Sequence, residues 1–142
     1  MEVTDLPAAL EFARDRHKGV LTTIRRDGRP QLSNIVFATS TGGSPLISVT
    51  DDRAKTRNLR RDPRAALHVT DDSFWRYVVL DGTAEVSGVT ESPHDAVADT
   101  LVEIYRQVSG EHPDWDEFRA AMVAERRCVV TLTPSTAYGQ IG

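Results

Sequence analysis

The residues with the clearest chemical meaning lie in one basic segment of the chain, residues 53–64. This segment carries six cations and one anion, although the whole chain of 142 residues has a formal net charge of −4. It follows an apolar run, residues 46–50, and an acidic pair, Asp51 and Asp52. That order is typical of a strand, a helix cap and a short helix. Because a helix N-terminus offers free backbone N–H groups and a partial positive charge, the segment predicts a site for a phosphate or carboxylate group.

Three side chains in the first turn of this expected helix would add donors to the anion site: Lys55, Thr56 and Arg57. Hydrogen bonds from cationic donors to phosphate or carboxylate oxygens are stronger than neutral ones. A solvated surface helix is the alternative interpretation. The density of cations directly after a strand favours anion binding.

A second group of polar residues interrupts an otherwise apolar strand, which we expect over residues 31–38. Gln31, Ser33 and Asn34 either form the exposed face of that strand or present amide and hydroxyl groups to a flat heteroaromatic ring. Trp75 and Tyr77 alternate along another expected strand, residues 74–80. They either fill the core or line a ligand site.

The sequence lacks the motifs of several common enzyme classes: the Gly-x-Ser-x-Gly elbow, the P-loop and Gly-x-Gly-x-x-Gly. The four histidines share no short metal-ligand spacing, so we predict no metal site and expect His68 to be structural. Capping and turn chemistry explain the adjacent pairs of aspartates better than acid–base catalysis does. No catalytic side chain is identified.

The composition of the chain limits the classes of protein to which it can belong. The chain is 39% hydrophobic and 27% charged, as in ordinary soluble proteins, and its length suits one domain over residues 1–142. Residues 1–6 lack the apolar run of a signal peptide, and no segment approaches about 18 apolar residues. The single cysteine, Cys128, excludes an internal disulfide and suits the cytoplasm, and we expect it in the core. Mild acidity argues against a nucleic-acid partner.

The local patterns predict mainly strands, with helices inserted late. Asp27-Gly28 predicts a hairpin turn, and Asp62-Pro63 is expected to end the basic helix. Gly82 marks either a second hairpin turn or a bulge inside one long strand. Strands are expected at residues 19–25, 31–38, 46–50, 64–70, 74–80 and 127–133, the last closed by Pro134, with a first helix over residues 5–17.

The two late helices are expected after residue 91. Ser92-Pro93 predicts the start of one and Gly110 its end, while Asp114 is expected to cap the other. Six or seven strands with short connections favour a mainly β, antiparallel barrel with α+β decoration.

Three stretches of the sequence carry a family resemblance: Pro30-Gln31-Leu32-Ser33-Asn34, residues 53–65 and residues 80–84. The chain resembles the pyridoxamine-phosphate-oxidase-like split β-barrels. More closely, it is similar to the actinobacterial flavin/deazaflavin oxidoreductases of the B subgroup, which use the deazaflavin coenzyme F420. The resemblance implies a homodimer of six- to seven-stranded antiparallel split β-barrels with flanking helices, and two cofactor sites at the dimer interface.

The resemblance also assigns roles to particular residues. It favours Gly82 as a close approach in mid-strand. It implies that the cofactor phosphate is held by Arg53, Lys55, Thr56 and Arg57. It implies that the cofactor ring is lined by Gln31, Leu32, Ser33, Asn34 and Ser48. It also implies that the partner chain contributes Trp75 and Tyr77 to the site.

The implied function is an oxidoreductase that takes a hydride from reduced coenzyme F420 and reduces a conjugated small molecule. An FMN-binding protein of the same fold and a non-catalytic cofactor-binding protein are the alternatives. The cofactor carries the hydride, so no protein nucleophile is required. The proton donor is either solvent or Tyr77, and the substrate is not defined.

Overall fold

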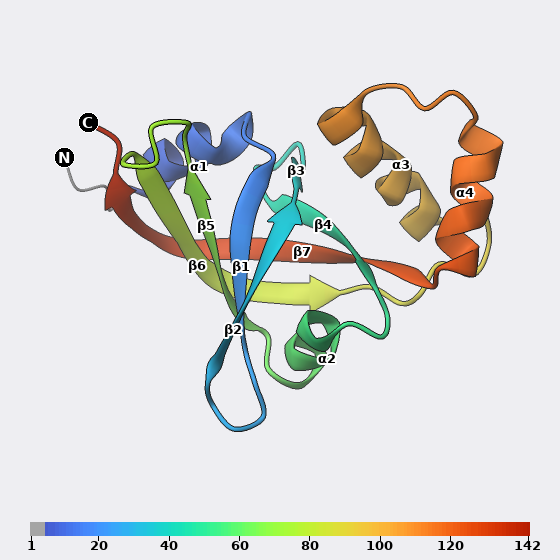
Figure 1. Cartoon of the computed structure of the whole chain (residues 1–142), viewed down its shortest axis with the longest axis horizontal. Helices are drawn as coiled ribbons and strands as arrows, with labels where there is room; N and C mark the ends of the chain where they lie inside the picture. Colours follow the sequence, from blue (N-terminus) through green and yellow to red (C-terminus); the bar gives the residue numbers. More distant parts are fainter. Residues whose placement is uncertain (1–4) are drawn as a thin grey trace.

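Residues 5–142, which the computed structural model describes, form seven antiparallel strands in one sheet and four helices (Figure 1). The sheet order is β2-β1-β5-β6-β7-β4-β3, and the sheet curls into an α+β split barrel, as expected. The strands are β1 (Lys18–Ile24), β2 (Pro30–Val36), β3 (Ala38–Thr39), β4 (Pro45–Thr50), β5 (Arg64–Thr70), β6 (Tyr77–Val86) and β7 (Arg127–Gln140). The helices are α1 (Leu6–Arg14), α2 (Ala54–Arg61), α3 (Ala96–Ser109) and α4 (Trp115–Ala124).

The barrel interior forms the main hydrophobic core. Alternate residues of each strand point into it, and Leu21, Leu67 and Leu80 are completely buried there. Helix α1 contributes Ala9 to this core and α2 contributes Leu59. The two helices lie at opposite ends of the barrel, α1 above and α2 below in Figure 1. The prediction about a signal peptide concerns mainly residues 1–4, which lie outside the described residues.

Helices α3 and α4 pack on the outer face of the sheet and form a second core. Leu101, Phe118 and Met122 lie against Leu46 of β4 and Val129 of β7. No helix within residues 5–142 is long and apolar enough to cross a membrane.

The ends of α3 and α4 are fixed by capping groups. Asp95 begins α3 by accepting a hydrogen bond from Ala98 N, so the start predicted at Ser92-Pro93 was wrong. Hydrogen bonds from the Thr90 hydroxyl and from backbone N–H groups hold the pKa of Asp95 well below its usual range. Gly110 at the C-cap of α3 and Asp114 at the N-cap of α4 confirm the other two predictions.

Gly82 lies in mid-strand, so the hairpin interpretation was wrong and the bulge interpretation is confirmed. Strand β6 continues past it, with a register shift between Asp81 and Gly82. A Cβ at Gly82 would lie 2.0 Å from the Thr133 carbonyl oxygen. Strand β7 also runs through Pro134, which we had expected to close it, because Pro134 sits at the irregularity where a ladder N–H is not required.

The residues before β6 form a loop, residues 71–76, and not the start of the strand. Asp71 organises this loop: its carboxylate accepts a hydrogen bond from Ser73 N at 2.9 Å and pairs with Arg76 at 3.2 Å. Phe74 has a φ of 74°, which is unusual for a bulky residue. Trp75 therefore belongs to the loop, and the prediction that it alternates with Tyr77 along one strand was wrong.

Candidate functional site

Three residues separate β4 from the basic helix α2, which begins at the corner that the sequence predicts. Its N-cap is Arg53, and no side chain caps the helix, so the prediction that Asp51 or Asp52 does so was wrong. Asp52 instead accepts a hydrogen bond from the Thr50 hydroxyl at 2.8 Å, which lowers its pKa. Asp51 pairs with Arg60 at 3.0 Å. Both carboxylates prefer these partners to the backbone N–H groups of the helix, which stay available.

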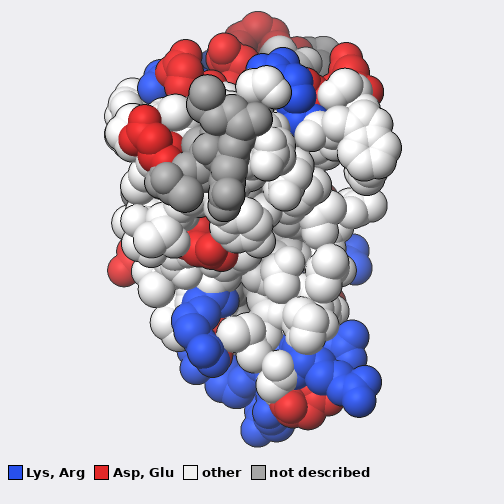
Figure 2. Space-filling view, turned by 90° about the vertical axis from the view of Figure 1, so that its left-hand side faces the viewer, with Lys and Arg blue, Asp and Glu red and all other residues white. Residues whose placement is uncertain are grey.

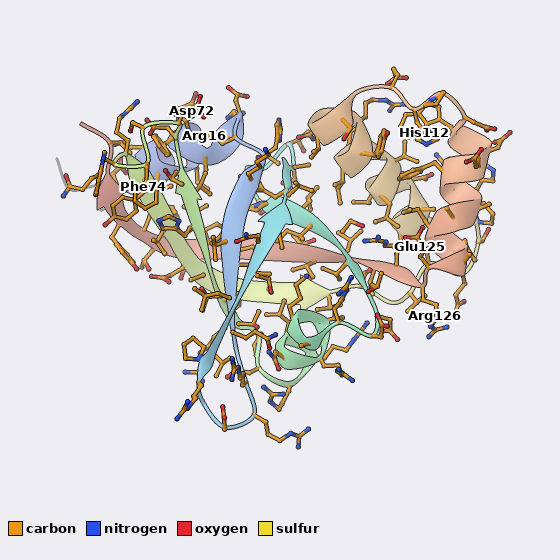
Figure 3. All side chains as sticks on the ribbon, in the orientation of Figure 1. Arg16, Asp72, Phe74, His112, Glu125 and Arg126 are labelled. Atoms are coloured by element: carbon orange, nitrogen blue, oxygen red, sulfur yellow. The ribbon has the colours of Figure 1, made fainter. Side chains whose placement is uncertain are left out.

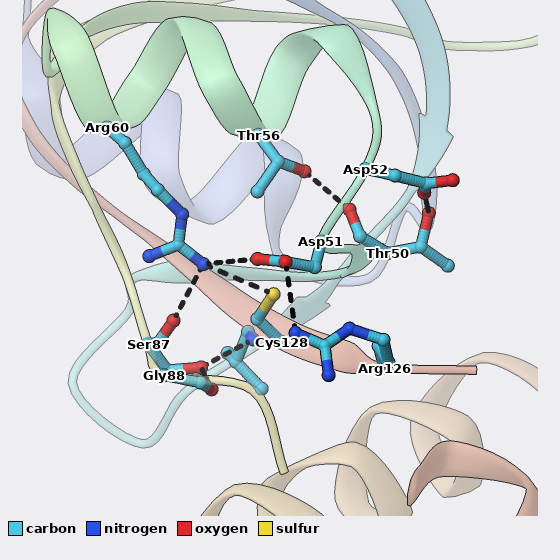
Figure 4. A network of polar contacts seen from close by, with 10 residues as sticks. Thr50, Asp51, Asp52, Thr56, Arg60, Ser87, Gly88, Arg126 and Cys128 are labelled. Atoms are coloured by element: carbon cyan, nitrogen blue, oxygen red, sulfur yellow. Dashed lines mark hydrogen bonds and ion pairs between the residues drawn. The ribbon is translucent and has the colours of Figure 1, made fainter. Parts of the chain in front are cut away.

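Arg60 ties α2 to the sheet (Figure 4). Its Nη2 donates to the Asp51 carboxylate, to the Ser87 carbonyl at 3.3 Å and to Cys128 Sγ at 3.6 Å. Arg126 reaches the other oxygen of Asp51 at 3.4 Å. Cys128 is buried as predicted, and burial raises the pKa of its thiol. The charge of Arg60 is therefore compensated by a partner within the chain.

Two further cations of the basic segment also bond to groups within the chain. Arg61 donates to the Ile24 carbonyl and to Asn58 Oδ1. Arg64 pairs with Asp62 at 2.8 Å, and its hydrogen bonds lower the pKa of Asp62 to about 2. Half of the six cations are structural.

The other three cations, Arg53, Lys55 and Arg57, make no ion pair with any residue in the range 5–142. Arg53 and Arg57 are exposed and Lys55 is half-buried. Burial, followed by the nearby charges of Arg53 and Arg127, lowers the pKa of Lys55. This is the electrostatic setting in which an added anion is favourable.

Positive charge gathers at the same end of the molecule (Figure 2). The hairpin between β1 and β2 carries exposed Arg25, Arg26 and Arg29 there, close to α2 in Figure 1. The chain as a whole is acidic, so this basic end is a local feature and not a consequence of composition.

Two of the predicted site residues are held by contacts within the chain. Thr56 is completely buried, and its hydroxyl donates to the Thr50 carbonyl at 2.8 Å, so its side chain anchors the corner. Ser48 accepts a hydrogen bond from Arg127 Nη1 at 3.4 Å, and Arg127 is oriented by Glu125 at 2.9 Å. Arg127 was not predicted as part of the site, because nothing local in the sequence links it to β4.

The polar strand β2 lies beside the basic helix, which brings two predicted groups of site residues together. Gln31 and Ser33 are half-buried, whereas Leu32 and Asn34 face outward and are exposed. Asn58 of α2 makes the link: its Nδ2 donates to Gln31 Oε1 at 3.0 Å and to the Thr23 hydroxyl at 3.1 Å.

Sequence reasoning assigned no role to Asn58. An asparagine inside a short helix was the available signal, because its amide usually competes with helical hydrogen bonds.

The loop before β6, in which Phe74 is labelled, lies at the other end of the barrel from α2 (Figures 1 and 3). Trp75 belongs to this loop and Tyr77 begins β6 directly after it. Strand β5 runs from the end of α2 to this loop, and its seven residues span about 20 Å at about 3.3 Å per residue. Tyr77 stacks on His68, with ring centroids 5.3 Å apart. Trp75 is 78% exposed beside Phe74. One chain alone does not bring these aromatic residues to the basic corner.

The outer face of the sheet carries exposed apolar side chains. Leu32 is 62% exposed and Val36 45% exposed on edge strand β2, and Tyr138 on β7 is also exposed. Burial along β2 therefore inverts the usual pattern, with polar Gln31 turned inward and Leu32 turned to solvent. Leu32 and Val36 lie on the same exposed face of β2, and exposed apolar residues on an edge strand are typical of an interaction surface.

Solved structures share this fold at low sequence identity. A conserved hypothetical protein from Mycobacterium tuberculosis has a TM-score of 0.73 at 20% identity, covering 97% of this chain and 86% of that chain. An F420 reductase has a TM-score of 0.66 at 24% identity, covering 92% and 93%. The heme storage protein from Vibrio cholerae has a TM-score of 0.66 at 16% identity, covering 92% and 89%. At these sequence identities the likeness shows a shared fold alone.

Family membership rests on the sequence. The profile of the pyridoxamine 5'-phosphate oxidase family matches residues 6–140, which is almost the whole chain. The matched residues include the strands of the split barrel and the basic corner after β4. The chain belongs to the pyridoxamine 5'-phosphate oxidase family.

Proposed function

We propose that this protein is a reductase that uses reduced coenzyme F420 as hydride donor to a conjugated small molecule. The observation that carries the proposal is the group of three cations, Arg53, Lys55 and Arg57, that lack an ion pair among the described residues at the start of α2. The other three cations of the same segment are neutralised or anchored within the chain.

Lys55 would be the main phosphate ligand. Its ammonium is half-buried beside Arg53, and its lowered pKa reflects the cost of keeping that charge without a counter-ion. The free N–H groups of the first turn of α2 point to the same place and favour an anion. Exposed Arg57 and the exposed arginines of the β1–β2 hairpin add further positive charge. This surplus favours a ligand with carboxylates beyond its phosphate.

Residues 31–34 and Ser48 would line the ring of the cofactor. The hydrogen bond from Asn58 fixes Gln31 on β2, and Arg127 fixes Ser48 on β4. When bound, the deazaflavin supplies the hydride. The side chains of this protein orient the ring and exclude water, and such positioning can contribute about 7–11 kcal/mol at its upper limit. Tyr77 or solvent supplies the proton to the product.

The complete site would need two chains. Trp75 lies about 20 Å along the barrel from the basic corner of its own chain, a distance estimated from the length of β5. Its loop is braced by Asp71 and presents Trp75 almost fully to solvent. We propose a homodimer in which the exposed face of β2 packs on a second copy and Trp75 and Tyr77 cover the partner's cofactor.

FMN is the second candidate cofactor, favoured by membership of the pyridoxamine 5'-phosphate oxidase family. It also combines a phosphate with a tricyclic ring, so the same corner would hold it. The two ligands differ in the additional carboxylates of the deazaflavin tail. Binding measurements therefore separate the two candidates.

The test is titration of the purified protein with coenzyme F420 and with FMN. We expect tighter binding of the deazaflavin, and Lys55→Ala should weaken it by roughly 1.5–3 kcal/mol, the value of a charge-assisted hydrogen bond. Arg64→Ala is the matched control, since Arg64 is already paired with Asp62 and should leave affinity unchanged. Protein that carries stoichiometric FMN and does not bind the deazaflavin would overturn the proposal.

The shared site has its own test. Leu32→Arg should convert a dimer into a monomer in sedimentation experiments, and Trp75→Ala should weaken cofactor binding without dissociating the dimer. Arg29→Ala, a change at the nearby exposed hairpin, is the control for dissociation. A wild-type monomer that binds cofactor fully at micromolar concentration would reject the shared site.

A further inference from the structure

A cleft of about 940 Å³ opens on the side of the barrel that α3 covers. Its walls come from β4, β6 and β7, from α2 and from the first two turns of α3. None of the residues proposed above to bind the cofactor lines it. Its size lies within the range of about 300–1,000 Å³ that is usual for small-molecule sites. The cleft is therefore a second site of suitable size.

Apolar side chains form much of the wall of this cleft. Leu46 and Val129 lie on the sheet side, Val97 lies on the α3 side, and Leu59 and Val86 lie toward α2. A ligand with a sizeable apolar body would bury its surface against these side chains. Chemical selectivity must come from the few polar groups among them.

Most of those polar groups are already engaged within the chain. Arg60 is bonded to Asp51 and to the Ser87 carbonyl. The Thr100 hydroxyl donates to the Ala96 carbonyl of its own helix. These groups have little capacity left for a ligand.

Two polar side chains in the wall remain available. The Glu85 carboxylate and the Thr131 hydroxyl make no side-chain hydrogen bond or ion pair within the described part of the chain. Glu85 and Thr131 are direct partners in the β6–β7 ladder, so their side chains lie next to each other on the outer face. Glu85 is consequently the charged side chain of the wall that has no ion-pair partner within residues 5–142.

We propose that this cleft binds an apolar small molecule that carries a protonated amine. Glu85 and Thr131 accept hydrogen bonds from the ammonium group, while the apolar body lies against Leu46, Val97 and Val129. The same arrangement disfavours carboxylates and phosphates, which the basic corner attracts. This proposal does not depend on the cofactor or on the proposed reaction.

The experiment compares three ligands with the same ring system and different charge: 1-naphthylmethylamine, 1-naphthalenemethanol and 1-naphthoate. Each is titrated into ¹⁵N-labelled protein without cofactor, and amide shifts report both the affinity and the place of binding. Glu85→Gln removes the charge and keeps the shape of the side chain. Glu91→Gln is the matched control, because Glu91 is exposed, makes no ion pair among residues 5–142 and lies outside this cleft.

We expect the amine to bind more tightly than the alcohol, and the alcohol more tightly than the carboxylate. Glu85→Gln should reduce the affinity for the amine by up to about fivefold, as is typical of a solvent-accessible ion pair, and Glu91→Gln should not. Thr100→Phe, which fills the cleft from α3, should weaken all three ligands. The proposal fails if the amine has no advantage, if its advantage survives Glu85→Gln, or if the shifts lie outside the cleft. Because no cofactor is present, failure here leaves the proposed function untouched.

Discussion

Asn58 is the residue whose removal tests most directly how the candidate site is built. Its side chain is 6% exposed and joins the basic helix to strands β1 and β2 through hydrogen bonds to Thr23 and Gln31. Asn58→Ala removes both bonds, together with the hydrogen bond that Asn58 Oδ1 accepts from Arg61 at 3.3 Å. Thr23 is completely buried and its hydroxyl loses this partner, whereas Gln31 is only half-buried and can turn to water.

The expected magnitude follows from this difference in burial. An unsatisfied buried hydroxyl costs about 1–3 kcal/mol, and a lost, partly exposed hydrogen bond costs about 0.5–1.5 kcal/mol. We therefore expect Asn58→Ala to lower the free energy of unfolding by about 2–4 kcal/mol. Because Gln31 loses its anchor, the affinity for the proposed cofactor should fall as well.

Urea unfolding measures the change in the free energy of unfolding. All variants are measured at the same protein concentration, because association makes the apparent stability depend on concentration. Asn34→Ala is the matched control, since Asn34 is an exposed asparagine on β2, and it should change stability by no more than about 0.5 kcal/mol.

Thr23→Val provides a second check, because it removes the hydroxyl that Asn58→Ala leaves unsatisfied. Adding Asn58→Ala to Thr23→Val should cost about 1 kcal/mol less than adding it to the wild type. Additive effects of the two changes, or a loss below about 0.5 kcal/mol in Asn58→Ala, would refute the reasoning.

Three further predictions concern the scaffold. Gly82→Ala should cost about 1–3 kcal/mol or more in thermal or urea unfolding, because its Cβ would meet the backbone of β7, while Gly88→Ala, in open space, should be neutral. Asp95→Ala should cost about 0.5–2 kcal/mol at pH 7 by removing a helix cap. The folded-state pKa of Asp95 lies below its unfolded value, so the stability difference from wild type should shrink as pH falls below about 4 and should not grow. Cys128 should react with a thiol reagent at neutral pH only after unfolding, because it is fully buried with a raised pKa; prompt reaction of the native protein would contradict its burial.

Much of the fold follows from local patterns in the sequence. Strand β5 occupies the predicted residues 64–70, and the basic helix ends at Asp62-Pro63 as predicted. The hairpin at Asp27-Gly28 joins β1 to β2, with Gly28 at a φ of 87°. Alternation, turn residues and the steric effect of proline act over a few residues, and a sequence displays them directly.

The long strand at the end of the chain could not be predicted in this way. Pro134 is a local signal for termination, but β7 continues because its partner β6 shifts register at Gly82 and leaves Pro134 without a required N–H bond. Trp75 was misplaced for a similar reason: the bonds of Asp71, and not strand propensity, decide the conformation of residues 71–76.

The sequence by itself determined that six cations follow strand β4 in a chain of net negative charge. Only the tertiary structure decided which of them are free to bind an anion. Arg60 and Arg61 bond to Ser87 and Ile24, which are 27 and 37 residues away, and these distant carbonyls come within reach only when the sheet closes around α2. Arg53, Lys55 and Arg57 make no ion pair within residues 5–142, because the two carboxylates nearest to them in the sequence take other partners: Asp52 bonds to the Thr50 hydroxyl, and Asp51 pairs with Arg60 and Arg126. Arg126 is 75 residues from Asp51, so that pairing forms only when the chain folds.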